Sequence, residues 1–173
     1  EGEYLNGEKN GKGKEYNYIT GKLEFEGEYL NGEINGKGKE YYYNGKIKFE
    51  GEYLKRKRNG KGKEYYNNGK LKFEGEYLNG EINGKGKEYY YNGKIKYEGE
   101  YLNGEINGKG KEYNDNNKLE FEGKYKNGKR WNGIIKEYFF NGELVFEGSY
   151  LYGEINGKGK EYYDNGKLEF EGE

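Results

Sequence analysis

A repeat of 24 residues runs through the whole chain, and this period constrains the fold more than any other feature. In the second copy it reads Glu-Gly-Glu-Tyr-Leu-Asn-Gly-Glu-Ile-Asn-Gly-Lys-Gly-Lys-Glu-Tyr-Tyr-Tyr-Asn-Gly-Lys-Ile-Lys-Phe. Periods of roughly 20 to 50 residues are typical of architectures in which each unit buries its apolar side chains only against neighbouring units. We therefore interpret residues 1–173 as a single repeat array without a linker. The repeats span residues 1–25, 26–49, 50–73, 74–97, 98–121, 122–146 and 147–170, with a partial eighth from residue 171.

Apolar and charged residues alternate within each repeat with a period of two. Ile47, Phe49 and Tyr53 fall on one side of an extended chain, whereas Lys48 and Glu50 fall on the other. This alternation is typical of a half-buried strand with an aromatic face and a charged face. Apolar residues at helical spacing are missing, and the frequent Gly also disfavours helices. The sequence therefore predicts an all-β fold.

Asn-Gly pairs predict a turn at both ends of each strand pair. The segment Tyr43-Asn44-Gly45 suits a three-residue hairpin loop, in which a type I turn is followed by a left-handed residue at the Gly. In the fifth repeat Asn117 replaces this Gly, and Asn is the next most tolerant residue in the left-handed region. We therefore expect a hairpin in every repeat.

The length of this loop decides which residues face each other. A three-residue loop places Tyr41 opposite Ile47 on the aromatic face and Glu40 opposite Lys48 on the charged face. A two-residue loop would instead send Tyr41 outward. We choose the three-residue loop because Tyr occupies the Tyr41 position in all seven repeats. Lys39 then shares the aromatic face, unless a bulge near Gly36-Lys37-Gly38 resets the alternation, and the sequence leaves the presence of this bulge open.

A single hairpin cannot bury its aromatic face, so the repeats must pack against one another. We expect seven hairpins stacked edge to edge into an elongated, twisted single-layer antiparallel sheet. In this arrangement Tyr29, Tyr53, Tyr77 and Tyr101 form part of a continuous aromatic ladder.

These residues resemble the MORN repeat (membrane occupation and recognition nexus). The resemblance is carried by Phe49-Glu50-Gly51-Glu52-Tyr53-Leu54, by the Asn-Gly that follows this segment in most repeats, and by Gly60-Lys61-Gly62. The x-Asn-Gly-Lys-Leu segment is also similar to the variant MORN repeats of bacteria and large viruses. The chain departs from the pattern in having Tyr where many members have Trp, and in Gly133-Ile134-Ile135 of the sixth repeat. The resemblance implies stacked β-hairpins used as scaffolds, dimerisation modules and sometimes lipid-associated platforms.

Composition removes most enzyme chemistry. The chain has no His and no Cys, so it lacks a thiol nucleophile, an imidazole base and the usual ligands of zinc. The repeated Glu residues alternate with Lys, which indicates a solvated sheet face rather than a catalytic carboxylate pair. The only Asp residues, Asp115 and Asp164, lie in different repeats, which disfavours a calcium site. We expect no enzyme activity, no cofactor, no metal and no small-molecule substrate, and the net charge of -1 also disfavours nucleic acid.

Two loops depart from the repeat at the same position. The loop that normally reads Asn-Gly-Glu-Ile becomes Lys55-Arg56-Lys57-Arg58 in the third repeat and Asn127-Gly128-Lys129-Arg130-Trp131 in the sixth. All three Arg residues and the only Trp lie in these loops, which we expect on one edge of the sheet. The predicted partner- or lipid-binding residues are Lys55, Arg56, Lys57, Arg58, Lys126, Lys129, Arg130 and Trp131.

Basic and aromatic loops admit three interpretations. Arg and Trp are favoured anchors at protein interfaces, whereas a basic cluster with Trp also suits an anionic lipid headgroup. Neutral drift of a solvent-exposed loop is the third. The leading hypothesis is a non-enzymatic repeat scaffold that mediates protein–protein interaction or self-association through open sheet ends. The alternative is a peripheral membrane module that binds anionic lipid, and the lack of Cys favours an intracellular location for either.

Overall fold

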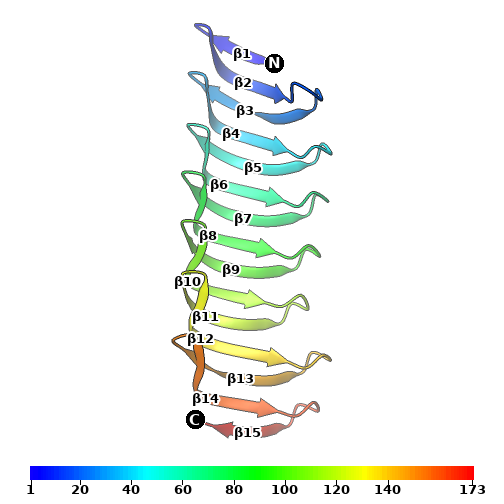
Figure 1. The fold of residues 1–173 in the computed structure, drawn as a ribbon, viewed down its shortest axis with the longest axis vertical. Coiled ribbons are helices and arrows are strands. Elements are labelled where there is room, and N and C mark those ends of the chain that lie inside the picture. The colour runs from blue at the N-terminus through cyan, green and yellow to red at the C-terminus, as the bar shows by residue number, and fades with distance from the viewer. The chain divides into compact units, whose positions relative to one another are not determined.

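The computed structural model describes all 173 residues and consists of fifteen β-strands joined by turns. Consecutive strands are neighbours in one antiparallel sheet whose order follows the chain from β1 to β15 (Figure 1). The predicted all-β class and the hairpin repeat are confirmed. The structure has no helix that could span a membrane.

The chain divides into two compact parts, Glu1–Gly86 and Lys87–Glu173, which are described separately. The N-terminal part contains β1 (Gly2–Leu5), β2 (Glu8–Tyr16), β3 (Leu23–Leu30), β4 (Glu33–Tyr41), β5 (Ile47–Leu54), β6 (Lys57–Tyr65) and β7 (Leu71–Leu78). Strand β8 (Glu81–Tyr89) includes the boundary. The C-terminal part contains β9 (Ile95–Leu102), β10 (Glu105–Tyr113), β11 (Leu119–Lys126), β12 (Lys129–Tyr138), β13 (Leu144–Leu151), β14 (Glu154–Tyr162) and β15 (Leu168–Gly172).

Two kinds of turn alternate along the chain. The short turns have two central residues with positive φ, such as Asn31 at 50° and Gly32 at 80°, as a type I′ hairpin turn requires. In the longer loops the amide of Gly45 donates to the carbonyl of Tyr42 at 2.8 Å, and Gly45 has a φ of 82°. Asn117 takes the same left-handed conformation with a φ of 64°. The three-residue loop predicted from the sequence is therefore confirmed.

The register confirms one predicted pair and corrects the faces of its neighbours. Tyr41 pairs with Ile47 as expected, but a bulge then pairs Glu40 with Phe49 rather than with Lys48. Because a one-residue slip exchanges the two faces of a strand, Glu40 lies on the aromatic face. The Tyr41 hydroxyl instead reaches the charged face, where it donates to Glu26 Oε1 at 2.5 Å. Placing Glu40 on the charged face and Tyr41 on the aromatic face was wrong.

A second bulge lies where the sequence left the question open. Strand β4 pairs Ile34 with Tyr29 and Gly38 with Gly27, so the residues around Gly36 form an irregular segment. Gly36 has a φ of 111°, which L side chains rarely adopt. The bulge resets the alternation and brings Lys39 opposite Glu26 on the charged face. The bulged register is therefore the correct one.

Aromatic rings cover a line of glycines to form the core. A Cβ atom at Gly62 would lie 2.5 Å from Phe49 Cζ, so the ring can pack on the sheet only where side chains are missing. Phe49 in turn makes edge contacts with Tyr53 at 5.6 Å and with Tyr77 at 5.3 Å between ring centroids. The predicted tyrosine ladder is thus an alternation of Phe and Tyr from successive repeats. The buried apolar residues of the two parts are Phe25, Tyr29, Ile34, Phe49, Tyr53, Phe73 and Tyr77, and Tyr97, Tyr101, Phe121, Tyr125 and Ile135.

The sixth repeat changes register within one strand. Strand β12 pairs Gly133 with Gly123 of β11, but on its other edge Ile135 pairs with Gly148 of β13. The departure Gly133-Ile134-Ile135 thus places a buried Ile where the other repeats pair two glycines. The strand also accommodates Trp131 as an extra residue, since Tyr125 pairs with Arg130 and Lys124 pairs with Asn132.

Candidate interaction site

The third-repeat loop divides into an exposed turn and a half-buried residue. Lys55 and Arg56 are the two central residues of the turn between β5 and β6, with φ values of 48° and 65°. The corresponding turns of the other repeats end in Gly, as in Asn79-Gly80. Lys55, Arg56 and Lys57 are exposed. These three residues therefore remain a basic surface, which we call the basic turn.

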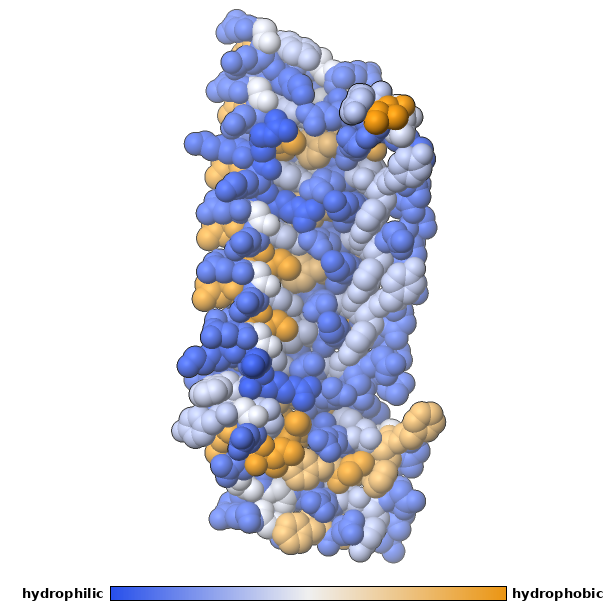
Figure 2. All heavy atoms as spheres, viewed as in Figure 1, coloured by the Kyte–Doolittle hydropathy of each residue, from blue (hydrophilic) through white to orange (hydrophobic).

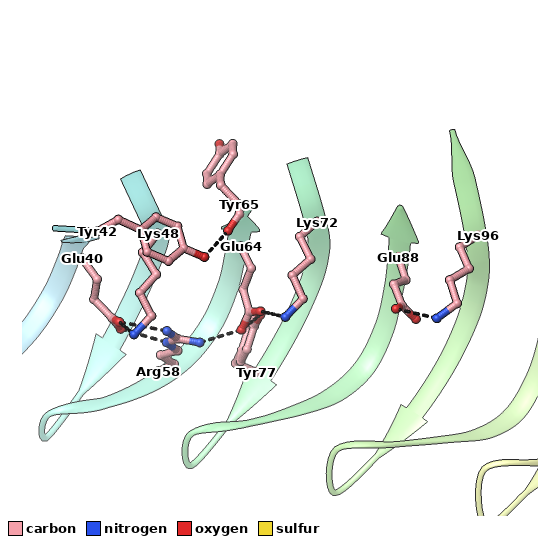
Figure 3. Close-up of polar contacts among 10 residues, drawn as sticks. All are labelled: Glu40, Tyr42, Lys48, Arg58, Glu64, Tyr65, Lys72, Tyr77, Glu88 and Lys96. Atoms are coloured by element: carbon pink, nitrogen blue, oxygen red, sulfur yellow. Dashed lines mark hydrogen bonds and ion pairs between the residues drawn. The ribbon is translucent and has the colours of Figure 1, made fainter. Parts of the chain in front are cut away.

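Arg58, by contrast, points into the aromatic face (Figure 3). Its Nε and Nη2 atoms each donate to one oxygen of Glu40 at 3.0 Å, and Nη1 donates to Glu64 Oε1 at 2.6 Å. The guanidinium carbon lies 4.0 Å from the centroid of the Phe49 ring. Only 20% of the Arg58 side chain is exposed. Arg58 therefore bridges two successive repeats through their glutamates.

The surroundings of Glu40 stabilise its ionised form. Burial raises the pKa of Glu40, but the hydrogen bonds and the positive charge of Arg58 outweigh it and leave the pKa lowered. Burial raises the pKa of Tyr53, whose hydroxyl also donates to Glu40 Oε1 at 2.8 Å. Glu40 is therefore a carboxylate at neutral pH, and its contacts are those of a structural ion pair.

Arg130 of the sixth repeat also pairs with two glutamates in the C-terminal part, but both belong to the fifth repeat. Its Nε donates to Glu112 Oε2 at 2.9 Å and its Nη2 to Glu120 Oε2 at 3.3 Å. The guanidinium carbon lies 5.4 Å from the Phe121 ring centroid. Arg58 and Arg130 occupy the ninth position of their repeats, where Lys9 of the first repeat similarly pairs with Glu15 at 2.7 Å.

Trp131 belongs to a different surface. Its ring meets that of Tyr152 edge-on at 5.7 Å, and Lys126 Nζ lies 5.0 Å from the Trp131 centroid. Tyr152 is 70% exposed and has a φ of 56° at a turn position where five other repeats have Asn. We call Lys126, Trp131 and Tyr152 the Trp131 cluster. Lys129, the remaining predicted residue, is exposed beside it in the sequence.

Backbone contacts fix the Trp131 cluster to its strand. The amide of Tyr152 donates to Asn132 Oδ1 at 2.9 Å, and the amide of Gly153 donates to the Trp131 carbonyl at 3.2 Å. In Figure 2, hydrophobic residues gather over β12 to β14 of the C-terminal part. The exposed apolar residues of these strands include Ile134, Leu151 and Ile155. Sequence reasoning missed Tyr152, although its replacement of the turn Asn was visible.

The fold defines a tandem β-hairpin repeat protein. No group of three or more His, Cys, Asp or Glu side chains is placed to hold a metal ion.

The comparison with protein families names the repeat. The MORN repeat model matches residues 1–17, 25–47, 73–95 and 97–118, and the MORN repeat variant matches residues 58–79, 131–152 and 155–173. The chain belongs to the MORN repeat family, a non-enzymatic repeat family, as the sequence resemblance predicted. Such repeats are consistent with a repeat scaffold or interaction module. No curated protein matches the chain.

Proposed function

We propose that the chain is a repeat scaffold that binds a protein partner through the Trp131 cluster. The observation that supports the proposal is the edge contact of Trp131 with the exposed Tyr152, which lies outside the buried aromatic ladder. Trp and Tyr dominate the binding energy of protein interfaces because they present a large rigid surface with a polar edge. A lysine over the Trp ring adds a charged group at the rim.

The backbone of Tyr152 supports the same proposal. A left-handed conformation disfavours a bulky residue by about 1 kcal/mol or more relative to Gly or Asn. Five of the other short turns carry Asn at this position and avoid most of that cost. Tyr152 therefore reduces stability at its turn, and a binding role accounts for its presence there.

The decisive experiment is capture of partners from cells of the source organism, with each variant immobilised in parallel. We expect Trp131→Ala and Tyr152→Asn to reduce capture of the same proteins by at least about tenfold, the loss typical of a hot-spot side chain. The matched control is Tyr43→Ala, since Tyr43 is also 70% exposed but lies in a longer loop. Equal capture by all four proteins would contradict the proposal. Capture of the chain itself, with a sedimentation coefficient that falls in Trp131→Ala, would identify the partner as a second copy.

The basic turn supports a second candidate function, which is binding to an anionic membrane surface. Lys55 and Arg56 hold left-handed conformations without the Gly that relieves them elsewhere, and together with Lys57 they are exposed. Each basic side chain near an anionic bilayer contributes about 1 kcal/mol. Flotation with phosphatidylserine vesicles should therefore weaken in the triple variant Lys55→Asn, Arg56→Gly, Lys57→Glu, which restores the common turn and leaves Arg58 in place. Failure of the unaltered chain to float would exclude this function.

A further inference from the structure

Arg58 shows how the aromatic face binds a guanidinium group. The group lies between the carboxylates of two successive repeats, Glu40 and Glu64, and above the ring of Phe49. Lys48 and Lys72 approach the same carboxylates at 3.6 and 3.3 Å. Two glutamates and two lysines therefore line this site, and the site still holds a third cation.

The same set of positions recurs 48 residues later in the C-terminal part. Glu88 and Glu112 take the places of Glu40 and Glu64, and Tyr97 takes the place of the Phe49 ring. The position of Arg58 is occupied by Ile106, whose side chain is shorter and carries no charge. A groove of about 280 Å³ is found at this place. Its lining consists of Glu88, Lys96, Tyr97, Ile106, Glu112, Tyr125, Gly128 and Arg130.

The carboxylates of Glu88 and Glu112 line the groove, and both side chains are partly exposed. Glu88 pairs with Lys96 at 2.9 Å (Figure 3), and its side chain is 28% exposed. Glu112 accepts from Arg130 Nε and from the Tyr125 hydroxyl, each at 2.9 Å, and its side chain is 31% exposed. An ionised carboxylate has about four acceptor sites, so these contacts do not saturate either carboxylate. Glu40 demonstrates this capacity, since it accepts from Arg58 and Tyr53 while Lys48 lies near.

The charge balance also matches the occupied site. The groove carries two glutamates and two cations, Lys96 and Arg130, as the Arg58 site carries two glutamates and two lysines. In addition, Glu120 replaces the Lys72 of the occupied site and pairs with Arg130. The groove is therefore no less favourable to an added cation than the site that holds Arg58.

We propose that this groove, between Glu88 and Glu112, binds the guanidinium group of an arginine side chain from a protein partner. A planar guanidinium can donate to both carboxylates through its fork of N–H groups, whereas an ammonium group has no such fork. The proposal rests on the scaffold function in one respect, that the ligand belongs to a protein. It differs in position and chemistry from the Trp131 cluster, which presents an aromatic surface.

The test uses the full chain with ¹³C-labelled tyrosine rings and N-acetyl-arginine methylamide as the probe. We expect saturable shifts at Tyr97 and Tyr125 with a Kd on the order of millimolar, and a several-fold weaker response to the lysine analogue. The variant Ile106→Arg fills the groove with the chain's own guanidinium, as Arg58 does, and should abolish the shifts. Glu88→Gln should weaken binding by about tenfold, which is the loss expected on removing one charged partner.

Two results would overturn the inference. One is a titration in which Tyr97 and Tyr125 do not respond, and the other is a response that persists unchanged in Ile106→Arg. The thermal midpoint of Ile106→Arg establishes that the variant is folded, and Glu88→Gln gives an independent reading that keeps Ile106. Loss of partner capture in Trp131→Ala with no probe binding would defeat this inference alone. Probe binding without any captured partner would defeat the proposed function alone.

Discussion

The backbone amide of Lys37 donates a hydrogen bond of 2.8 Å to the Glu28 carboxylate across the bulge between β3 and β4. Lys109 and Glu100 repeat this contact at 2.8 Å in the C-terminal part. The carboxylate replaces the ladder partner that the bulge removes from this amide. It also occupies the space beside Gly36 that a side chain would need. The glutamate at the third position of the repeat therefore has a structural role.

This contact predicts a large effect of a small substitution. Gly36→Ala should lower the free energy of unfolding by about 1 to 3 kcal/mol, because it forces an L residue to a φ of 111° and pushes the Glu28 carboxylate aside. Urea unfolding followed by circular dichroism measures the loss. The control is Gly45→Asn, because Asn117 already occupies the equivalent loop position. An alanine variant as stable as the parent would show that the bulge is not required.

Replacement of Arg58 tests the bridge between repeats. Arg58→Ile introduces the residue that most other repeats carry at this position, yet it should destabilise the chain by about 1 to 2 kcal/mol at neutral pH because Glu40 and Glu64 lose their shared partner.

The effect of this replacement should depend on pH. The folded chain lowers the pKa of Glu40, so the stabilisation is present above the unfolded value of about 4.3 and is lost as the pH falls through the folded pKa. Unfolding midpoints of parent and Arg58→Ile should therefore converge in acid. If the difference between the two unfolding midpoints stays constant as the pH falls below the folded pKa of Glu40, the Glu40 bridge is not the source of that difference.

The local turns could be predicted from the sequence, but the faces of two residues could not. Gly45 and Asn117 mark a left-handed loop position by their own backbone preferences, and the structure agrees. The bulge at Glu40 and Tyr41 has no such marker, and the period of two alone assigned both residues to the wrong face. Register depends on how two strands pair, so the backbone preferences of single residues do not reveal it.

The same reason limits what the sequence indicated about the site. A run of four basic residues suggested one exposed surface, but the pairing of Arg58 with Tyr53 turns that residue onto the aromatic face. Its bridging role depends on Glu40, 18 residues earlier, and could be inferred only after the register was known. Whether the remaining residues bind a partner stays a prediction.

Alkaline pH should unfold the chain as its tyrosines ionise. Burial and a hydrogen bond to Glu50 raise the pKa of Tyr65 to about 12. Burial and a hydrogen bond to Glu98 likewise raise the pKa of Tyr113 to about 12. Because the unfolded value is near 10, the contribution to stability is complete below pH 10 and is lost as the pH rises through about 12. Tyrosinate absorbance and circular dichroism should change together. Ionisation of all tyrosines near pH 10 with the sheet intact would contradict the burial of these hydroxyls.

The basic turn should be a source of instability. Replacing Lys55 by Asn and Arg56 by Gly should raise the free energy of unfolding by about 1 kcal/mol, because both φ values become favourable for their residues. The double variant Lys46→Asn, Lys70→Asn removes the same charge from loops near the other ends of the strands and serves as the control. A gain equal to that of the control would mean that charge, rather than backbone conformation, sets the stability of this turn.

Tyr152→Asn separates stability from binding at the Trp131 cluster. The variant should be more stable by about 0.5 to 1 kcal/mol, since Asn tolerates a φ of 56° better than Tyr does. Removal of the Trp131 edge contact at 5.7 Å offsets part of this gain, and for that reason Trp131→Ala should be measured beside it. Thermal midpoints of the parent, both single variants and the double variant give the coupling between the two rings. A Tyr152→Asn chain that is less stable than the parent would show that the ring is part of the fold, and its exposure would then no longer argue for a partner.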